Sequence, residues 1–215
     1  IIDLSKDLPF SNQNILITAG PTYEAIDPVR FIGNRSSGKT GISLALECAN
    51  NGAKVNLILG PSNIDVRHSN ISVHKVESAN EMLNIANSNF ESSDVSIFTA
   101  AVADYTPSSV AKNKIKKSDD NLTISLLKTT DILLEMGLKK TDKQFVVGFA
   151  LETENELENA KEKLKSKNLD MIVLNSLNNK GAGFEYNTNK ITIIDRQNNI
   201  FDFELKDKSE VAKDI

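Results

Sequence analysis

The chain has 215 residues, of which 40% are hydrophobic and 25% are charged, as in a soluble globular domain that buries a core of its own. Its 29 acidic and 25 basic residues give a net charge of −4, which argues against non-specific binding to nucleic acid. The single cysteine excludes an internal disulfide framework and a zinc site made of several cysteines. No apolar run approaches the roughly 20 residues of a membrane span, so we expect a cytoplasmic protein that binds no membrane.

Apolar runs that stop at turn residues alternate with segments of helical periodicity along the chain. The apolar runs predict strands at 14–19, 54–59, 71–76, 95–98, 122–126, 144–149, 170–174, 190–194 and 200–205. The periodic segments predict helices at 38–51, 78–91, 130–139 and 153–167. Strands that alternate with helices form right-handed crossovers. We therefore expect an α/β, Rossmann-like three-layer fold with a mainly parallel sheet and small antiparallel additions.

The organisation is that of one domain behind a short lead-in. Residues 1–13 lack periodicity and contain Pro9, which indicates an extended lead-in or linker before a domain at 14–215. Ile1 is not an initiator residue, so we expect the chain to be part of something longer. In such folds ligands lie beyond the carboxyl ends of the strands. The segments that meet this condition are 19–40, 99–117, 129–132 and 149–153.

The stretch that begins at Gly33 matches the phosphate-loop pattern G-x-x-x-x-G-K-S/T. A true phosphate loop leaves the first strand directly, whereas 13 residues separate Ala19 from Gly33. The best candidate for the magnesium-binding carboxylate is Asp195, in the expected terminal hairpin. Two interpretations stay open: a helix start that binds an anion through its free N–H groups, and an ordinary helix capped by Ser36 or Ser37.

Tyr186 and Lys190 have the Y-x-x-x-K spacing of the short-chain dehydrogenases. That pair depends on a helix that stacks the lysine one turn beyond the tyrosine, whereas this segment leads into an expected strand. The glycine fingerprint of a dinucleotide site is also missing after Gly20. Hydride transfer is therefore a weak alternative.

Histidine and cysteine chemistry has little support. His68 and His74 have no cysteine or carboxylate at ligand spacing, and Cys48 lies within an expected helix beside small apolar residues. We expect Cys48 to pack in the core. A site in this chain would then position substrates and stabilise charge instead of forming a covalent enzyme intermediate.

Small residues follow the strand expected at 95–98, in the sequence TAAVAD that ends at Asp104. Small side chains let a flat ligand approach the backbone closely. Asp104 itself would lie at the ligand edge of the sheet.

A run of lysines comes shortly afterwards: Lys112, Lys114, Lys116 and Lys117 place four cations in six positions. Alternation puts Lys114 and Lys116 on one face while Ile115 anchors the other. Such charge runs are more often solvated loops, so a binding role and a solvated loop both stay open.

The last long helix carries two lysines beside its expected buried stripe. At about 100° per residue, Leu157, Ala160 and Leu164 form one apolar stripe. Lys163 and Lys167 are stacked one turn apart at its border, where their stems can pack on the core and their ammonium groups can bind a polyphosphate. Surface lysines are common on amphipathic helices, so this pattern alone is weak.

Seven segments carry a resemblance in combination. They are ITAGPT (17–22), DPVRFI (27–32), NRSSGK (34–39), AAVADY (100–105), KIKK (114–117), KTTDI (128–132) and VGFALET (147–153). In this order they resemble the phosphopantothenoylcysteine synthetase domain of coenzyme A biosynthesis, over residues 14–175. In bacteria such a domain is often fused behind a flavin-dependent phosphopantothenoylcysteine decarboxylase, and the lead-in resembles that junction.

The resemblance implies roles for individual residues. Asn34 matches the family's substrate-contacting asparagine, with Ser36, Ser37 and Gly38 beside it at the substrate. The implied nucleotide contacts are Phe98, Thr99, Ala100, Asp104, Lys114, Thr129, Thr130, Asp131, Ile132, Phe149, Lys163 and Lys167. Asn34 and Lys114 are the implied catalytic residues, and Asp104 is a candidate ligand for Mg²⁺. Thr130 departs from the proline that the family usually has there, which leaves the rigidity of that loop open.

The implied activity is CTP-dependent ligation of L-cysteine to 4′-phosphopantothenate through an acyl-cytidylate. CTP is expected because the chain resembles the bacterial enzymes, Mg²⁺ is expected with it, and no flavin is expected in this domain. The family also implies a homodimer, to which the strand at 122–127 is a candidate contributor. Two alternatives stay open: a regulatory module that binds nucleotide without turnover, and a phosphate-loop NTPase that depends on Lys39.

Overall fold

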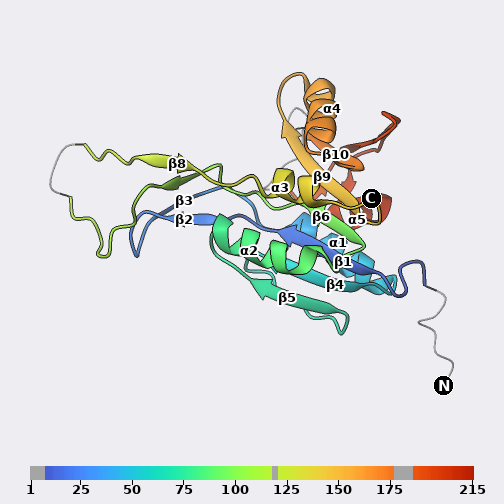
Figure 1. Cartoon of the computed structure of the whole chain (residues 1–215), viewed down its shortest axis with the longest axis horizontal. Coiled ribbons are helices and arrows are strands. Elements are labelled where there is room, and N and C mark those ends of the chain that lie inside the picture. The colour runs from blue at the N-terminus through green and yellow to red at the C-terminus, as the bar shows by residue number, and fades with distance from the viewer. Residues whose placement is uncertain (1–7, 118–120, 177–185) are drawn as a thin grey trace.

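A computed structural model describes residues 8–117, 121–176 and 186–215. Six parallel strands form most of its central sheet: β1 (Asn14–Ala19), β4 (Lys54–Leu59), β5 (Ile71–Lys75), β6 (Val95–Phe98), β9 (Phe145–Glu152) and β10 (Met171–Ser176). Two antiparallel strands, β12 (Ile191–Asp195) and β13 (Ile200–Asp202), complete it. The expected α/β class, with a mainly parallel sheet and antiparallel additions, is confirmed (Figure 1).

Helices cover both faces of this sheet because its strands are apolar on both sides. In β1, Ile15 and Ile17 belong to one core, together with residues of α1 (Lys39–Asn50) and α5 (Lys208–Asp214). Leu16 belongs to the core of the opposite face, which holds residues of α2 (Ala79–Phe90), α3 (Ile132–Lys139) and α4 (Glu156–Ser166). Burial on both faces is typical of parallel strands in three-layer folds.

The strand order is β13-β12-β10-β9-β6-β1-β4-β5. The chain runs from β1 outward through β4 and β5, then returns to the other side of β1 as β6. At this switch point the connections leave in opposite directions. A crevice is therefore expected beyond the carboxyl ends of β1 and β6.

Two hairpins form an extension that projects from the body of the molecule (Figure 1). β2 (Tyr23–Ala25) pairs with β3 (Phe31–Gly33), and β7 (Tyr105–Pro107) pairs with β8 (Leu126–Lys128). The strand predicted at 122–126 is therefore wrong in position, since only its last residue belongs to β8. The pairing continues one position beyond Pro107, where the N–H of Ser108 donates to the carbonyl of Ser125 at 2.9 Å.

The carboxyl-terminal segment and α4 differ from prediction in detail. Residues 206–214 form β14 (Lys206–Asp207) and α5, neither of which was predicted. The hairpin at Asn198 is confirmed, with a left-handed φ of 62° at that residue. In α4, Ala160 and Leu164 are buried as expected, but Leu157 is 39% exposed because it lies in the first turn, at the edge of the core.

The amino-terminal residues that the structure describes lie against the domain. Phe10 donates its backbone N–H to the carbonyl of Asn51 at 2.8 Å, directly after the end of α1. No helix within 8–117, 121–176 and 186–215 is long and apolar enough to cross a membrane.

Close packing of α1 against β1 depends on Gly41. A Cβ at this position would lie 2.5 Å from the Cβ of Ala19 and 2.5 Å from Oγ1 of Thr99. Both contacts are shorter than side chains tolerate. The start of α1 can therefore lie beside the ends of β1 and β6 only with glycine here.

Gly41→Ala should destabilise the protein, although glycine to alanine in a helix interior normally stabilises by about 1 kcal/mol. We expect overpacking to lower the free energy of unfolding by about 1–3 kcal/mol in urea titrations. Ser43→Ala, in the same helix and half-buried, is the control and should cause no loss. A stabilised Gly41→Ala variant would contradict the packing described.

Candidate functional site

A cavity of about 720 Å³ lies beyond the carboxyl ends of β1, β6 and β9, and we call it the strand-end cavity. Thr18, Phe98 and Leu151 line it from these three strands, and the start of α3 and the second half of α4 close its side. It therefore lies where the switch in strand order predicts a ligand.

Most residues implied by the resemblance line this cavity. They are Asn34, Phe98, Ala100, Asp104, Thr129, Thr130, Asp131, Ile132, Phe149, Lys163 and Lys167. The two lysines that helical angles placed together on α4 are among them. Thr99 lines a neighbouring pocket instead, and Lys114 lines neither.

The loop before α3 is fixed by hydrogen bonds to the segment after β6. Thr129 donates its backbone N–H to the carbonyl of Asp104 at 2.9 Å and its hydroxyl to the carbonyl of Ala103 at 2.6 Å. Asp131 then caps α3, accepting the Leu134 N–H at 3.0 Å. These contacts hold the loop although Thr130 stands where a proline is usual.

Lys163 and Lys167 each have a carboxylate partner. Lys163 Nζ lies 2.5 Å from Glu152 Oε1, and Lys167 Nζ lies 2.7 Å from Asp131 Oδ2. Burial raises the pKa of Asp131, but hydrogen bonds from Lys167 and the Leu134 N–H outweigh it, so the pKa is lowered overall. The cavity is therefore lined by both cationic and anionic side chains. Sequence reasoning gave Glu152 no role, although it lies within the quoted VGFALET segment.

Asn34 is attached to the segment after β6 through its side chain. Its Nδ2 donates to the carbonyl of Ala101 at 3.1 Å and to that of Val102 at 3.0 Å. Both amide hydrogens are thus used within the protein. The Oδ1 acceptor is the part of Asn34 that can serve a ligand.

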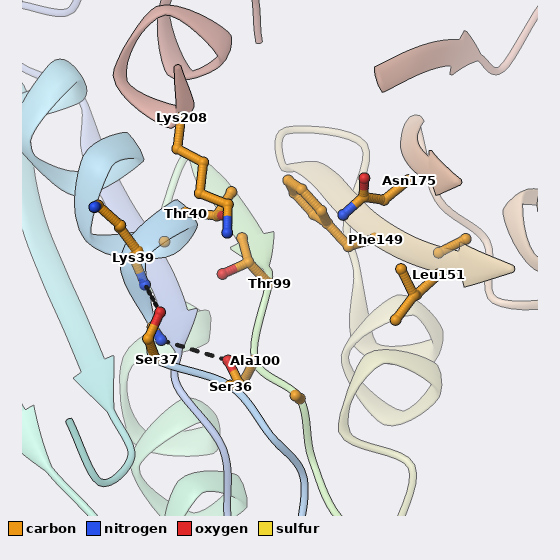
Figure 2. A pocket seen from close by; sticks show the side chains of 14 residues that line it. Ser36, Ser37, Lys39, Thr40, Thr99, Ala100, Phe149, Leu151, Asn175 and Lys208 are labelled. Atoms are coloured by element: carbon orange, nitrogen blue, oxygen red, sulfur yellow. Dashed lines mark hydrogen bonds between the residues drawn. The ribbon is translucent and has the colours of Figure 1, made fainter. Parts of the chain in front are cut away.

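A smaller pocket of about 130 Å³ adjoins the strand-end cavity at the start of α1, and we call it the α1 pocket (Figure 2). The two share four wall residues: Ala100, Ala101, Phe149 and Leu151. Ser36, Ser37 and Gly38 line the α1 pocket as the first residues before the helix. Ser36 and Ser37, which the resemblance places at the substrate, therefore line the α1 pocket, whereas Asn34 lines the adjoining strand-end cavity.

The helix cap at this pocket differs from the serine cap considered above. Gly38 is the N-cap, with φ of 78° and no side-chain hydrogen bond to the first turn. Oγ of Ser37 lies 3.4 Å from the Lys39 nitrogen, which is long for a capping bond. Backbone N–H groups of the first turn lack partners within a helix, so the start of α1 suits an anion better than an ordinary cap.

Lys208, which sequence reasoning missed, also lines the α1 pocket. It is the first residue of α5, is only 5% exposed, and extends toward Thr40 and Thr99 (Figure 2). Burial lowers the pKa of Lys208, and the nearby charge of Lys39 lowers it further. The sequence offered one signal for the helix that carries Lys208: the apolar pair Val211 and Ala212 follows the capping residue Asp207, a pattern typical of a short amphipathic helix.

Lys114 lies on the extension of β2, β3, β7 and β8. The N–H of its neighbour Ile115 donates to Asp27 Oδ2 at 3.0 Å, and the Ile115 carbonyl accepts from Arg30 Nη2 at 2.9 Å. Asp27 is buried and also binds the guanidinium and backbone N–H of Arg30. Within one chain, the structure does not bring Lys114 to the strand-end cavity.

The structure contradicts two alternative interpretations, the phosphate-loop NTPase and the dehydrogenase pair. Asp195 pairs with Met171, the first residue of β10, so it lies at the opposite end of the sheet from the start of α1 and cannot serve a phosphate loop there. Tyr186 and Lys190 flank β11 (Thr188–Asn189) instead of sharing a helix, which excludes the dehydrogenase pair.

Cys48 and the histidines carry no site in the part of the chain that the structure describes. Cys48 is buried in the core, as expected, and burial raises its pKa to about 11. His74 lies in β5, with Nε2 3.2 Å from Asn56 Oδ1. The described residues contain no group of three or more histidine, cysteine or acidic side chains that could hold a metal ion.

The family model described as "DNA/pantothenate metabolism flavoprotein C-terminal domain" matches residues 10–215. The chain belongs to this family. The coenzyme A biosynthesis bifunctional protein CoaBC of Bacillus subtilis is 43% identical over 207 residues, 96% of this chain and 51% of that protein. A protein named cysteine/cysteine sulfinic acid decarboxylase, from an unknown prokaryotic organism, is 52% identical over 96% of this chain and 58% of its own length. The chain thus spans about half the length of these relatives.

Solved structures agree with the family assignment. The crystal structure of the C-terminal domain of CoaBC has a TM-score of 0.80 and 38% identity, covering 95% of this chain and 92% of that one. The DNA/pantothenate metabolism flavoprotein of Streptococcus pneumoniae has a TM-score of 0.79 at 24% identity and covers 94% and 95%, which supports the fold. The resemblance carried by the seven segments is confirmed.

Asp27→Asn should lower the free energy of unfolding at neutral pH, and by less in acid. Hydrogen bonds from Arg30 hold the pKa of Asp27 well below its usual range in the folded protein. Such a group adds stability above its unfolded pKa of about 3.9, and that stability is lost as the pH falls through the folded value. The urea midpoint of the variant should therefore lie below wild type at pH 7, and the gap should narrow at pH 3.

Asp65→Asn is the matched control, because Asp65 pairs with Arg67 at an exposed position. Its midpoint should follow wild type at both pH values. Equal midpoints of wild type and Asp27→Asn at pH 7 would contradict the role given to Asp27.

Proposed function

We propose that this domain joins the carboxyl group of 4′-phosphopantothenate to the amine of L-cysteine, using CTP. The overall reaction is 4′-phosphopantothenate + CTP + L-cysteine → 4′-phosphopantothenoylcysteine + CMP + pyrophosphate. Membership of the family supports the proposal, as does similarity to bifunctional proteins of coenzyme A biosynthesis.

The observation that carries the proposal is the convergence of Asn34, Asp104, Lys163 and Lys167 on the strand-end cavity. These residues come from three separate segments, and the switch in strand order brings them together. The cavity volume lies within the roughly 300–1,000 Å³ typical of small-molecule sites. Cations, a carboxylate and an amide around one such space suit a nucleotidyl transfer, which depends on alignment and on neutralising charge.

In the first step a carboxylate oxygen of phosphopantothenate attacks the α-phosphorus of CTP, and the bond to pyrophosphate breaks. Lys163 and Lys167 neutralise phosphate charge in this scheme. In the second step the cysteine amine attacks the acyl carbon, the bond to CMP breaks, and the amine loses a proton. Because Asn34 Nδ2 is held by two backbone carbonyls, its Oδ1 accepts a hydrogen bond from the attacking amine beside the acyl group.

Mg²⁺ fits this cavity as a partner of the nucleotide. The ion prefers one or two carboxylates together with substrate phosphate oxygens, and Asp104 offers an exposed carboxylate there. When bound, Mg²⁺ would offset phosphate charge. The domain itself takes no flavin in this proposal.

The α1 pocket would hold a phosphate group of a substrate. Lys39 and Lys208 lie close enough for their charges to repel, at the positive end of the α1 dipole. An anion there relieves that repulsion and pairs with the N–H groups of the first helical turn. Ser36, Ser37 and Gly38 would then contact it, as the resemblance implies.

The wider assembly is also a proposal. A flavin-dependent phosphopantothenoylcysteine decarboxylase is expected in the other half of a bifunctional protein, because the chain spans about half of its CoaBC relatives. A homodimer is expected from the family. Lys114 keeps its proposed nucleotide contact only if the extension of one copy serves the cavity of another.

Incubation of the domain with 4′-phosphopantothenate, L-cysteine, Mg²⁺ and CTP should release pyrophosphate and form 4′-phosphopantothenoylcysteine. A coupled assay measures the pyrophosphate, and mass spectrometry detects the product. ATP, GTP and UTP should support slower release. Without cysteine, the acyl-cytidylate mass should accumulate. Absence of pyrophosphate with every triphosphate would contradict the proposal, and thermal protection by CTP without release would instead indicate a regulatory module.

Lys163→Gln and Lys167→Gln should each lower kcat/KM for CTP by about 10- to 100-fold, the value of a hydrogen bond to a charged group. Lys165→Gln is the matched control, because Lys165 lies on the same helix, is exposed, and does not line the strand-end cavity. It should stay within about twofold of wild type, and an equal loss in all three variants would indicate a general charge effect.

A further inference from the structure

The turn after α4 packs directly on the backbone of α3. A Cβ on Gly137, in the last turns of α3, would lie 1.9 Å from the carbonyl oxygen of Lys167. No side chain fits in that space. Lys167 and α3 are therefore in contact through their backbones, and glycine at 137 makes the contact possible.

Asn168 reinforces this contact from the next position. Its Nδ2 donates to the carbonyl oxygen of Gly137 at 2.9 Å. Its backbone has a left-handed φ of 52°, which asparagine adopts more readily than most residues. Oδ1 of the same amide accepts from Arg196 Nη2 at 2.5 Å, so one side chain joins α3 to the hairpin of β12 and β13.

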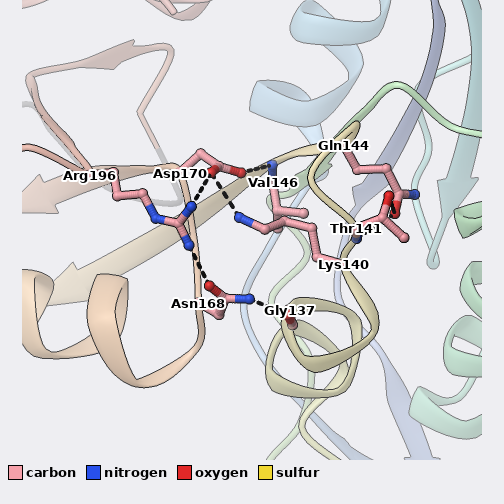
Figure 3. Close-up of polar contacts among 8 residues, drawn as sticks. All are labelled: Gly137, Lys140, Thr141, Gln144, Val146, Asn168, Asp170 and Arg196. Atoms are coloured by element: carbon pink, nitrogen blue, oxygen red, sulfur yellow. Dashed lines mark hydrogen bonds and ion pairs between the residues drawn. The ribbon is translucent and has the colours of Figure 1, made fainter.

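Arg196 is in turn fixed by a partly buried carboxylate (Figure 3). Asp170 lies 3.4 Å from Arg196 Nη1 and accepts from Lys140 Nζ at 2.8 Å. Its other oxygen accepts the Val146 N–H at 2.8 Å. The Asn168 amide is thus held on one side by α3 and on the other by Arg196, which Asp170 fixes in turn.

The same turn carries the Lys167 side chain into the strand-end cavity, where its ammonium meets Asp131 at the start of α3. Lys167 is therefore attached to α3 twice: its backbone rests on Gly137 near the end of the helix, and its side chain reaches the cap residue. A shift of the 167–168 turn would move the ammonium relative to Asp131 and the cavity.

We propose that Asn168 is a positioning residue, which together with Gly137 fixes the Lys167 ammonium in the strand-end cavity. Asn168 touches no ligand in this scheme and acts only through Lys167. The proposal rests on the proposed function where it concerns nucleotide binding. Its structural part, the placement of Lys167 beside Asp131, can be tested without any substrate.

Asn168→Gly is the main variant, because glycine keeps the left-handed backbone and removes only the amide. We expect KM for CTP to rise about 3- to 10-fold, while kcat and KM for phosphopantothenate stay within about twofold. Asn198→Gly is the matched control, since Asn198 has φ of 62°, is exposed, and lies in the adjacent hairpin away from the cavity. It should leave all three constants unchanged.

Titration of the Asp131 carboxyl by carbon-13 NMR, without substrate, provides the independent readout. Its pKa should rise toward the ordinary value in Asn168→Gly, because the hydrogen bond from Lys167 is weakened, and should stay unchanged in Asn198→Gly. A merely structural role for Asn168 would lower the melting temperature without this change. An unchanged Asp131 pKa in a folded Asn168→Gly variant overturns the proposal.

A double variant separates the proposal from the proposed function. In a Lys167→Gln background, Asn168→Gly should cause no further change in KM for CTP, because the group it positions is gone. A further loss of similar size overturns the proposal. If the Asp131 pKa rises in Asn168→Gly but neither variant alters CTP use, the positioning role stands and the nucleotide role of Lys167 fails.

Discussion

The site depends on the switch in strand order at β1 and β6, where the connections leave the sheet in opposite directions. Because β4 and β6 flank β1 on opposite sides, the segments that leave β1 and β6 cannot fill the space between them. Asn34 from one segment and Asp104 from the other border that space, and α3 and α4 complete it. Side chains as far apart in the chain as those of Asn34 and Lys167 thus face one cavity, without any local motif that places them there.

The sheet and most helices could be predicted because burial on two faces leaves a strong pattern. Residues 54–59 and 95–98 are mostly apolar, and they form β4 and β6 with the predicted bounds. The extension could not be predicted in this way, since β2, β3 and β7 are three residues each and bury little. Its strands are defined by pairing within each hairpin, and the pairing of so few residues leaves no periodicity in the sequence.

The site was predictable to a different degree for each residue. Helical angles alone placed Lys163 and Lys167 on one border of α4, and both line the cavity. Their carboxylate partners depend on which strand end and which loop lie opposite, which only the fold determines. Lys208 and Asn168 lay outside every motif for the same reason. Lys114 shows the limit of motif matching. A matching segment identifies the residue type, but it does not determine which cavity the side chain reaches, and Lys114 lines neither of the two described above.

The ion pairs explain how two lysines can stand in a partly enclosed cavity. An ammonium that is partly shielded from water loses hydration, and Glu152 and Asp131 offset that loss when no anion is bound. A phosphate group that binds there replaces one set of charged contacts with another, so the net gain is smaller than the contacts alone would provide. The displaced carboxylates, however, increase the negative charge around the phosphates. If the proposed CTP binds together with Mg²⁺, the cation would balance this charge, and the pairing that stabilises the cavity would then favour a metal-bound triphosphate over a bare one.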